Sequence, residues 1–398
     1  MLSRRTFLRS SLVALAPAVP GFLARTARAA GPRRDARLLV VVQLDGGNDG
    51  VNTVVPFKDE GYAKHRRQLR LPEQQLVKVN DEAAFHPAMR EMSELLQKGS
   101  FAAVQGVGYP NPNRSHFESM AIWHSARREA DGRGGLGWIG RAFDAAPRPA
   151  DNSPSSVYVG PGELPVALRG RRCVASGLTR PEDFVLDATV KPSRPGAPPA
   201  PAEDLASFVR RQALDSYATA ERMADVLSAP AAGGGYPSSD LARHLQLIAR
   251  LIKAGTGTRV FYARQGGYDT HAGQYGPHQR LLSELSEGLA AFLKELEAAK
   301  LAERVCVLMF SEFGRTVKEN GSAGTDHGTA GPVLLAGPAV RAGLIGKPPS
   351  LTDLDPEHGD LRVQTDFRQV YAGVLKDWLE IEPAQALGGE YEAVKLFK

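Results

Sequence analysis

The sequence predicts an α/β protein with a doubly wound, mostly parallel sheet sandwiched by helices. Apolar runs of strand length alternate along the chain with segments in which apolar residues recur every three or four positions. Polar residues directly follow several of the strand-like runs, as expected where a sheet of this kind binds a ligand at one edge. These two observations indicate the fold class.

The strand-like runs are continuously apolar rather than alternating, which indicates strands that are covered on both faces. We expect strands at residues 38–44, 258–263, 305–310 and 332–336, with a weaker one at 101–107. The helical stripes between them predict helices over 87–96, 241–252, 281–296 and 367–379.

The N-terminus has the layout of a twin-arginine export signal. Arg4 and Arg5 precede an apolar stretch at 11–24, and Ala27-Arg28-Ala29 matches a cleavage site. The alternative is a membrane anchor, but the stretch is shorter than the roughly 20 residues that a span needs, and prolines interrupt it. We therefore predict a cleaved signal at 1–29, the twin-arginine translocase as export partner, no stable membrane span, and a periplasmic or otherwise extracytoplasmic location.

Removing the signal changes the charge of the protein. The whole chain has 49 Lys and Arg against 44 Asp and Glu, and the signal contains five arginines and no acids. The mature chain therefore has 44 of each. Binding to nucleic acid depends on a basic surplus, so the composition argues against a nucleic-acid partner.

The domain organisation follows from composition. Residues 30–144 and 238–398 contain the predicted strands and helices of an α/β core. Residues 145–237 are rich in proline, alanine and glycine, with strand-like pieces at 156–159 and 164–174. We predict that this stretch is an insertion or cap with flexible linkers.

Carboxylates and imidazoles follow the predicted strands. Asp45 ends the first strand, Asp269 and His271 follow the 258–263 strand, Glu312 follows the 305–310 strand, and His327 precedes the last. At one edge of a sheet these groups would converge, and the carboxylates would repel one another without a cation. Oxygen and imidazole donors suit zinc or manganese, so we predict one or two divalent ions.

Each of these residues also has a structural interpretation. Asp45 opens a glycine-rich turn, and Asp269 with His271 fits a surface loop. Glu312 can instead pair with Arg315. His327 is the hardest to explain without a ligand, and its neighbour Asp326 can orient it.

A further segment centres on Ser115. Ser115 and Glu118 match a capping box, so the structural interpretation is a helix N-cap. The functional interpretation is a serine nucleophile at a helix N-terminus, where backbone amides attract an anionic ester. Arg114 and His116 flank the serine and can contact the anion.

These motifs resemble a family of unknown function whose members carry a twin-arginine signal, within the alkaline phosphatase/sulfatase-like superfamily. The segments with the resemblance are LDGGNDGVNTVVP (44–56), NRSHFES (113–119), GYDTH (267–271), SEFGRT (311–316) and DHGTAGP (326–332). The resemblance implies that Asp45 is a metal carboxylate on the first strand and that Ser115 is the nucleophile. It also implies that Asp269, His271 and His327 bind one ion, and that Glu312 belongs to a second.

Two departures limit what the resemblance implies. Phe313 stands where the superfamily pattern has a histidine, which puts the second metal site in doubt. The formylglycine signature of sulfatases is absent. The sequence therefore predicts a metal-dependent hydrolase of small phosphate or related anionic esters. The alternative is a catalytically inactive binding or structural envelope protein on a hydrolase-like fold.

Overall fold

The computed structural model describes residues 36–129, 135–146, 154–178 and 235–398. The predicted signal at 1–29 lies outside these residues, and so does most of the Pro-rich stretch, at 179–234. In the described part of the chain, no helix has the length and apolar character that crossing a bilayer requires.

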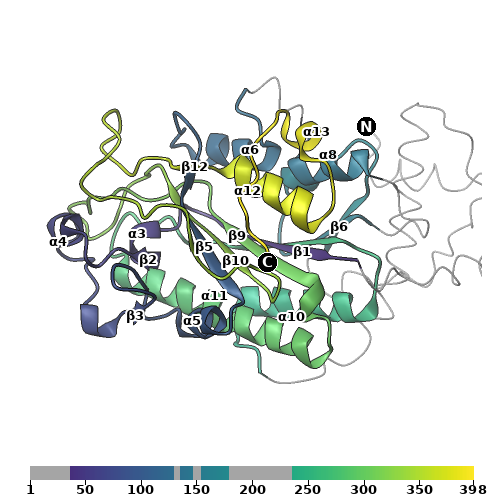
Figure 1. Ribbon diagram of the computed structural model, residues 1–398, viewed down its shortest axis with the longest axis horizontal. Coiled ribbons are helices and arrows are strands. Elements are labelled where there is room, and N and C mark those ends of the chain that lie inside the picture. The colour runs from purple at the N-terminus through teal and green to yellow at the C-terminus, as the bar shows by residue number, and fades with distance from the viewer. Residues whose placement is uncertain (1–35, 130–134, 147–153, 179–234) are drawn as a thin grey trace, which may run out of the picture.

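A nine-stranded sheet forms the centre of the molecule (Figure 1). Parallel pairs dominate it, and the exception is β10, which runs antiparallel to both of its neighbours. The prediction of a mostly parallel sheet is therefore confirmed. In spatial order the strands are β11 (Gly343–Ile345), β5 (Phe101–Gly108), β10 (Gly331–Ala336), β9 (Val305–Phe310), β1 (Leu38–Leu44), β8 (Val260–Gln265), β6 (Ser156–Val159) and β7 (Ala175–Leu178), with β12 (Thr365–Asp366) also paired to β5.

Helices cover both faces of this sheet (Figure 1). One layer contains α5 (Arg90–Gln97), α10 (Asp240–Ala254) and α11 (Tyr275–Ala298). The other contains α6 (His116–Ser125), α8 (Trp138–Ala145), α12 (Phe367–Gly373) and α13 (Pro383–Leu387), and a π-helical turn, Val374–Trp378, continues α12. Short elements complete the fold: α3 (Gly50–Thr53), α4 (Glu60–His65), the 3-10 turns Glu73–Gln75, Val166–Leu168 and Ala302–Arg304, and a small sheet of β2 (Val54–Val55), β4 (Ala84–Phe85) and β3 (Val77–Lys78).

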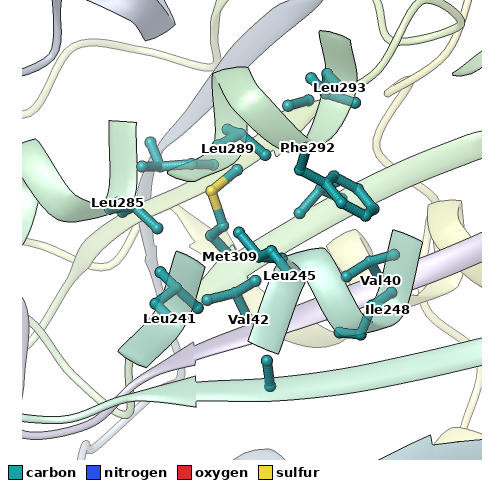
Figure 2. Close-up of a cluster of buried hydrophobic side chains, with 14 of the residues drawn as sticks. Val40, Val42, Leu241, Leu245, Ile248, Leu285, Leu289, Phe292, Leu293 and Met309 are labelled. Atoms are coloured by element: carbon teal, nitrogen blue, oxygen red, sulfur yellow. The ribbon is translucent and has the colours of Figure 1, made fainter. Parts of the chain in front are cut away.

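Two hydrophobic cores lie on opposite faces of the sheet. Successive side chains of a strand point to opposite faces, so β1 contributes Val40 and Val42 to one core and Leu39 and Val41 to the other. Figure 2 shows the first core, where leucines of α10 and α11 pack over β1 and β9. Fully burying one such side chain stabilises the fold by about 1.5–3 kcal/mol. The apolar stripes of α10 and α11 therefore account for their place against the sheet.

The start of the stretch 145–237 joins the main sheet. β6 pairs in parallel with β8, and β7 pairs with β6. Residues 156–159 were expected to be a strand, but as part of an insertion, whereas they extend the core sheet. The division into a core and a cap stays a prediction, because residues 179–234 are not among those described.

Five connections meet at one edge of the sheet. β1, β8 and β9 run in the same direction, and Leu44 lies opposite Gln265 while Gln43 lies opposite Phe310, so these strands end at one level. β10 is antiparallel to β9, so the loop before it reaches the same edge. The end of β5 lies beside the start of β10, which brings the beginning of α6 there as well.

Candidate metal centre

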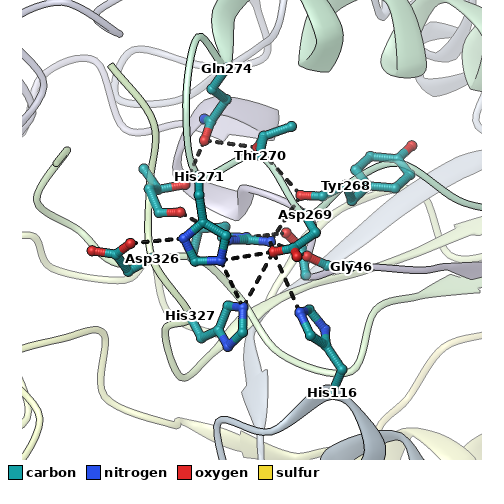
Figure 3. Close-up of polar contacts among 12 residues, drawn as sticks. Gly46, His116, Tyr268, Asp269, Thr270, His271, Gln274, Asp326 and His327 are labelled. Carbon is teal, nitrogen blue, oxygen red and sulfur yellow. Dashed lines mark hydrogen bonds and ion pairs between the residues drawn. The ribbon is translucent and has the colours of Figure 1, made fainter. Parts of the chain in front are cut away.

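The side chain of Asp269 is the meeting point of three imidazoles (Figure 3). Its Oδ1 atom lies 3.0 Å from Nε2 of His271, 3.3 Å from Nε2 of His327 and 3.4 Å from Nε2 of His116. The Nε2 atoms of His271 and His327 are 3.0 Å apart. Three connections of the sheet edge thus place donor atoms around one point.

The second nitrogen of each imidazole has an oxygen partner. Nδ1 of His271 lies 2.9 Å from a carboxylate oxygen of Asp326, and Nδ1 of His116 lies 2.7 Å from Oε1 of Glu312. Nδ1 of His327 lies 2.7 Å from the backbone carbonyl of Arg114. Ionised carboxylates and carbonyls only accept hydrogen bonds, so each Nδ1 must donate.

These hydrogen bonds determine whether the Nε2 atoms that face Asp269 carry a proton or a lone pair. A neutral imidazole that donates from Nδ1 has a lone pair at Nε2. Nη1 of Arg315, which can only donate, lies 3.4 Å from Nε2 of His271 and agrees with that assignment. The centre of the cluster therefore holds lone pairs and one carboxylate. A cation, either a proton or a metal ion, is needed to relieve their repulsion.

The donor set fits a metal ion. His116, Asp269 and His327 each offer an atom within 4.8 Å of the others, so the group can hold an ion. Nε2 of His116 is buried and has no hydrogen-bond partner, although such atoms usually have one. Imidazole and carboxylate donors are those of zinc sites, and histidines that donate their other N–H to an oxygen are typical of metal ligands.

Arg315 holds the loops of the site together. Its buried guanidinium donates to the carbonyls of Gly47 at 2.8 Å and Thr325 at 2.9 Å, and also to Gly46 and to Asp269. Burial acts to raise the pKa of Asp269, but the hydrogen bond and charge of Arg315 lower that pKa to about 2. Asp269 is therefore ionised at neutral pH and is available as an anionic ligand.

Gly46 lets the loop after β1 approach Asp269. Its φ is +116°, a conformation that side chains rarely adopt, and a Cβ atom there would lie 2.4 Å from the backbone nitrogen of Asp269. The glycine-rich turn after Asp45 thus serves close packing against the candidate metal centre.

Glu312 and Asp45 have protein partners. Oε1 of Glu312 accepts from the backbone N–H of Gly46 at 3.0 Å as well as from His116, and Oε2 accepts from Ser311 at 3.0 Å. Oδ2 of Asp45 lies 3.1 Å from Nε of Arg264, and burial raises the pKa of Asp45 despite that charge. The structure therefore brings Asp269, His271 and His327 together, with Glu312 behind His116 and Asp45 against Arg264.

The three residues predicted to be catalytic have different surroundings. Ser115 is exposed and precedes α6, but its side chain makes no capping hydrogen bond, so the expected capping box does not form. The Arg114 guanidinium pairs with Asp360 at 2.9 Å, which leaves its backbone carbonyl as its link to the site. His116 is in the cluster itself.

Sequence reasoning missed two features of the site. It treated His116 as an anion contact rather than a member of the cluster, and it gave Arg315 no more than a pairing role. The sequence signal for His116 was its position directly after the Ser115 cap, since the first residue of a helix at the sheet edge can point into the site. Nothing in the sequence indicated that Arg315 would contact three other loops.

Fold and site together define the class of the protein: an α/β protein with a cluster of histidines and an aspartate at the carboxyl edge of its sheet. A family model described as "Protein of unknown function (DUF1501)" matches residues 36–358, and the chain belongs to this family. A comparison with curated proteins finds no match.

Several solved structures are similar in fold at low identity. The C-terminal periplasmic domain of EcEptC from Escherichia coli, in complex with Zn, matches with a TM-score of 0.38 and 8% identity over 77% of this chain and 74% of that one. The PsFucS1 sulfatase from Pseudoalteromonas sp. matches with a TM-score of 0.38 and 11% identity, over 84% of this chain and 70% of that one. A protein in the alkaline phosphatase superfamily from Vibrio parahaemolyticus matches with a TM-score of 0.37 and 8% identity, over 81% of this chain and 66% of that one.

Proposed function

We propose that the protein is a metal-dependent hydrolase of phosphate or related anionic esters, with Ser115 as nucleophile. The observation that carries the proposal is the convergence of three imidazole Nε2 atoms on Oδ1 of Asp269. Asp269, His271 and His327 would hold a zinc or manganese ion, which when bound polarises the ester and stabilises developing negative charge. The superfamily resemblance of the motifs supports the same assignment.

Ser115 has the environment that the proposal requires. It immediately precedes α6, a helix of ten residues, so backbone N–H groups and the positive end of the helix dipole lie beside it. The residue before it supplies the carbonyl that orients His327, and the residue after it is His116. Ser115 therefore lies in sequence between Arg114, which holds His327, and His116. Its side chain is exposed, which leaves the hydroxyl accessible to a substrate.

The alternative is a binding or structural protein without catalysis. One observation favours it: Asp45 and Glu312, which the resemblance assigns to metal ions, are engaged by Arg264, Gly46, Ser311 and His116 instead. Such a protein would bind a metal ion or an anion at the same edge and release it unchanged.

Turnover distinguishes the two functions. The metal-loaded protein is assayed with an aryl phosphate, an aryl phosphodiester and an aryl sulfate, beside Ser115→Ala, Asp269→Asn and the control Ser238→Ala, an exposed serine before α10. The hydrolase predicts that Ser115→Ala and Asp269→Asn lose turnover while Ser238→Ala keeps it. Equal rates for wild type and Ser115→Ala would remove Ser115 from the role, and no turnover of any ester would favour the binding protein.

We also propose export through the twin-arginine translocase, with cleavage near Ala29. The proposal rests on the Arg4-Arg5 pair and the A-x-A site in the sequence. Fractionation of cells that produce the wild type and an Arg4→Lys/Arg5→Lys variant tests it. Wild type is expected outside the cytoplasm and the variant inside, and an equal distribution would contradict the proposal.

A further inference from the structure

His116 and Glu312 form a pair whose geometry matches that of the metal-binding histidines. We propose that His116 is a metal ligand oriented by Glu312, and that the centre holds one ion, bound by His116, Asp269, His271 and His327. The inference rests on the proposed function only in requiring that a metal ion binds at this edge.

The first argument is that the same construction occurs three times. His271 is held by Asp326 and His327 by the carbonyl of Arg114, and both direct Nε2 at Oδ1 of Asp269. His116, held by Glu312 at 2.7 Å, does the same at 3.4 Å. A carboxylate that accepts from one nitrogen of a histidine fixes the ring for coordination through the other.

The second argument is the state of the His116 nitrogen. Nε2 of His116 is buried without a hydrogen-bond partner, although the His116 side chain is 30% exposed as a whole. The nitrogen thus faces the cluster rather than solvent. An anion-binding role would require a proton on this nitrogen, whereas coordination uses its lone pair directly.

The third argument concerns the carboxylates available for a second ion. Both oxygens of Glu312 accept hydrogen bonds from protein groups, and both oxygens of Asp45 are engaged by Gln43 and Arg264. Within the described ranges, His116, Asp269 and His327 form a group of such donors that can share an ion, and Nε2 of His271 lies 3.0 Å from two of its atoms, Oδ1 of Asp269 and Nε2 of His327. The donors near the edge therefore suffice for a single ion.

The fourth argument is the place of Phe313. Its ring centroid lies 4.9 Å from that of His116 and 4.8 Å from that of His327, and a Cβ atom on Gly47 would lie 2.5 Å from the ring. An apolar ring therefore fills the space beside the cluster and packs against two of its histidines. It steadies the ligands and offers no donor to another ion.

The number of donors has a chemical consequence. Four protein ligands complete a tetrahedral zinc site, and closed sites of that kind are usually structural. Manganese accepts more ligands, so the same four donors leave it open positions. Three imidazoles and one carboxylate are the kind of donor set that zinc prefers, so hydrolysis by the zinc form would require the ion to accept a fifth ligand.

Metal titration tests the inference. The protein is stripped with a chelator and titrated with Zn²⁺ and with Mn²⁺ by calorimetry, and the bound metal is measured by elemental analysis. We expect one ion per chain. Loss of an orienting partner typically weakens metal affinity roughly 10–100-fold. His116→Gln should exceed that loss, and Glu312→Gln, which keeps an acceptor oxygen, should lie at its lower end.

Two further variants complete the experiment. His65→Gln, at the end of α4, should keep wild-type affinity, and Asp45→Asn should still bind one ion. Unchanged affinity in a folded His116→Gln protein, or two ions per chain with one lost in Asp45→Asn, would overturn the inference. Turnover by a two-ion protein would overturn it while leaving the hydrolase in place. One ion with no turnover of any ester, with either metal, would overturn the hydrolase instead.

Discussion

Two aspartates in the loops at the sheet edge, Asp49 and Asp269, meet arginines, yet their surroundings differ. Asp49 and Arg66 form an ion pair with both side chains fully buried, and Gln274 also donates to Asp49. The side chain of Asp269 is 49% exposed, and besides Arg315 its neighbours are three imidazoles that present lone pairs. In the first case donors match the acceptor, and in the second acceptors face one another. The comparison shows how a carboxylate that donors neutralise differs from one whose neighbours are mostly acceptors.

The largest expected effect is on the buried pair. Asp49→Ala should lower the free energy of unfolding by about 3–5 kcal/mol, because it leaves Arg66 buried without its counter-charge. Urea unfolding measures the loss. The double variant Asp49→Ala/Arg66→Met should lose less than the sum of the two single changes, and strict additivity would contradict the coupling.

The candidate metal centre should respond to metal ions, and the buried pair should not. Zn²⁺ at about one hundred times its Kd should stabilise the fold by about 2.7 kcal/mol, since the ion binds the folded state. Melting with zinc and with chelator measures the shift. Asp269→Asn should abolish this shift, and Asp49→Ala should keep it. A zinc-induced shift in Asp269→Asn equal to that of wild type would contradict metal binding at Asp269.

Acid should weaken the buried pair in a defined window. Burial acts to raise the pKa of Asp49, but Arg66 outweighs it, and the pKa is lowered to about 2. Unfolded aspartate titrates near pKa 3.9. The unfolded state therefore binds more protons between these values, and stability on the order of 2 kcal/mol is present above about pH 4 and lost as pH falls through 2. Urea unfolding of wild type and Asp49→Asn from pH 6 to pH 2 should show their difference shrinking with acid, and a constant difference would refute the assignment.

The smallest effect is expected at the partner of His271. Asp326→Asn should weaken Zn²⁺ binding roughly 10–100-fold, because it removes the charge that orients the ring. The Asp326 side chain is 59% exposed, so the free energy of unfolding without metal should stay within about 0.5 kcal/mol of wild type. Calorimetric titration and urea unfolding measure the two effects, and a large loss of metal-free stability would make Asp326 structural.

Much of this architecture could be predicted from the sequence, because hydrophobic periodicity reports burial directly. The apolar runs gave the main strands within two or three residues, and the position of Asp269, His271 and His327 after or before strands indicated their convergence. The strand 156–159 was found, but its pairing with β8 was not, because a run of four residues contains no information about its neighbour. The antiparallel direction of β10 relative to β9 was not predicted, for the same reason.

The roles within the site were harder to predict than its location. Glu312 and Asp45 follow strands just as Asp269 does, and what separates them is a few ångströms of side-chain geometry. Glu312 meets His116, 196 residues away in sequence, and Asp45 meets Arg264 on the neighbouring strand. Such pairings depend on the tertiary structure, so residue type and spacing alone could not distinguish a ligand from the residue that orients it.

The antiparallel strand β10 also has a consequence for the order of assembly. His327 lies in the loop that enters this strand, and its Nδ1 partner is 213 residues earlier in the chain. Contacts of such sequence separation carry a large loop-closure cost and slow folding. A nascent chain that has not yet extended past Gly331 cannot pair β10 with β9. Such a chain already contains His116, but the loop with His327 is not yet held at the sheet edge. We therefore expect the ion to be captured by the completed chain and not during synthesis.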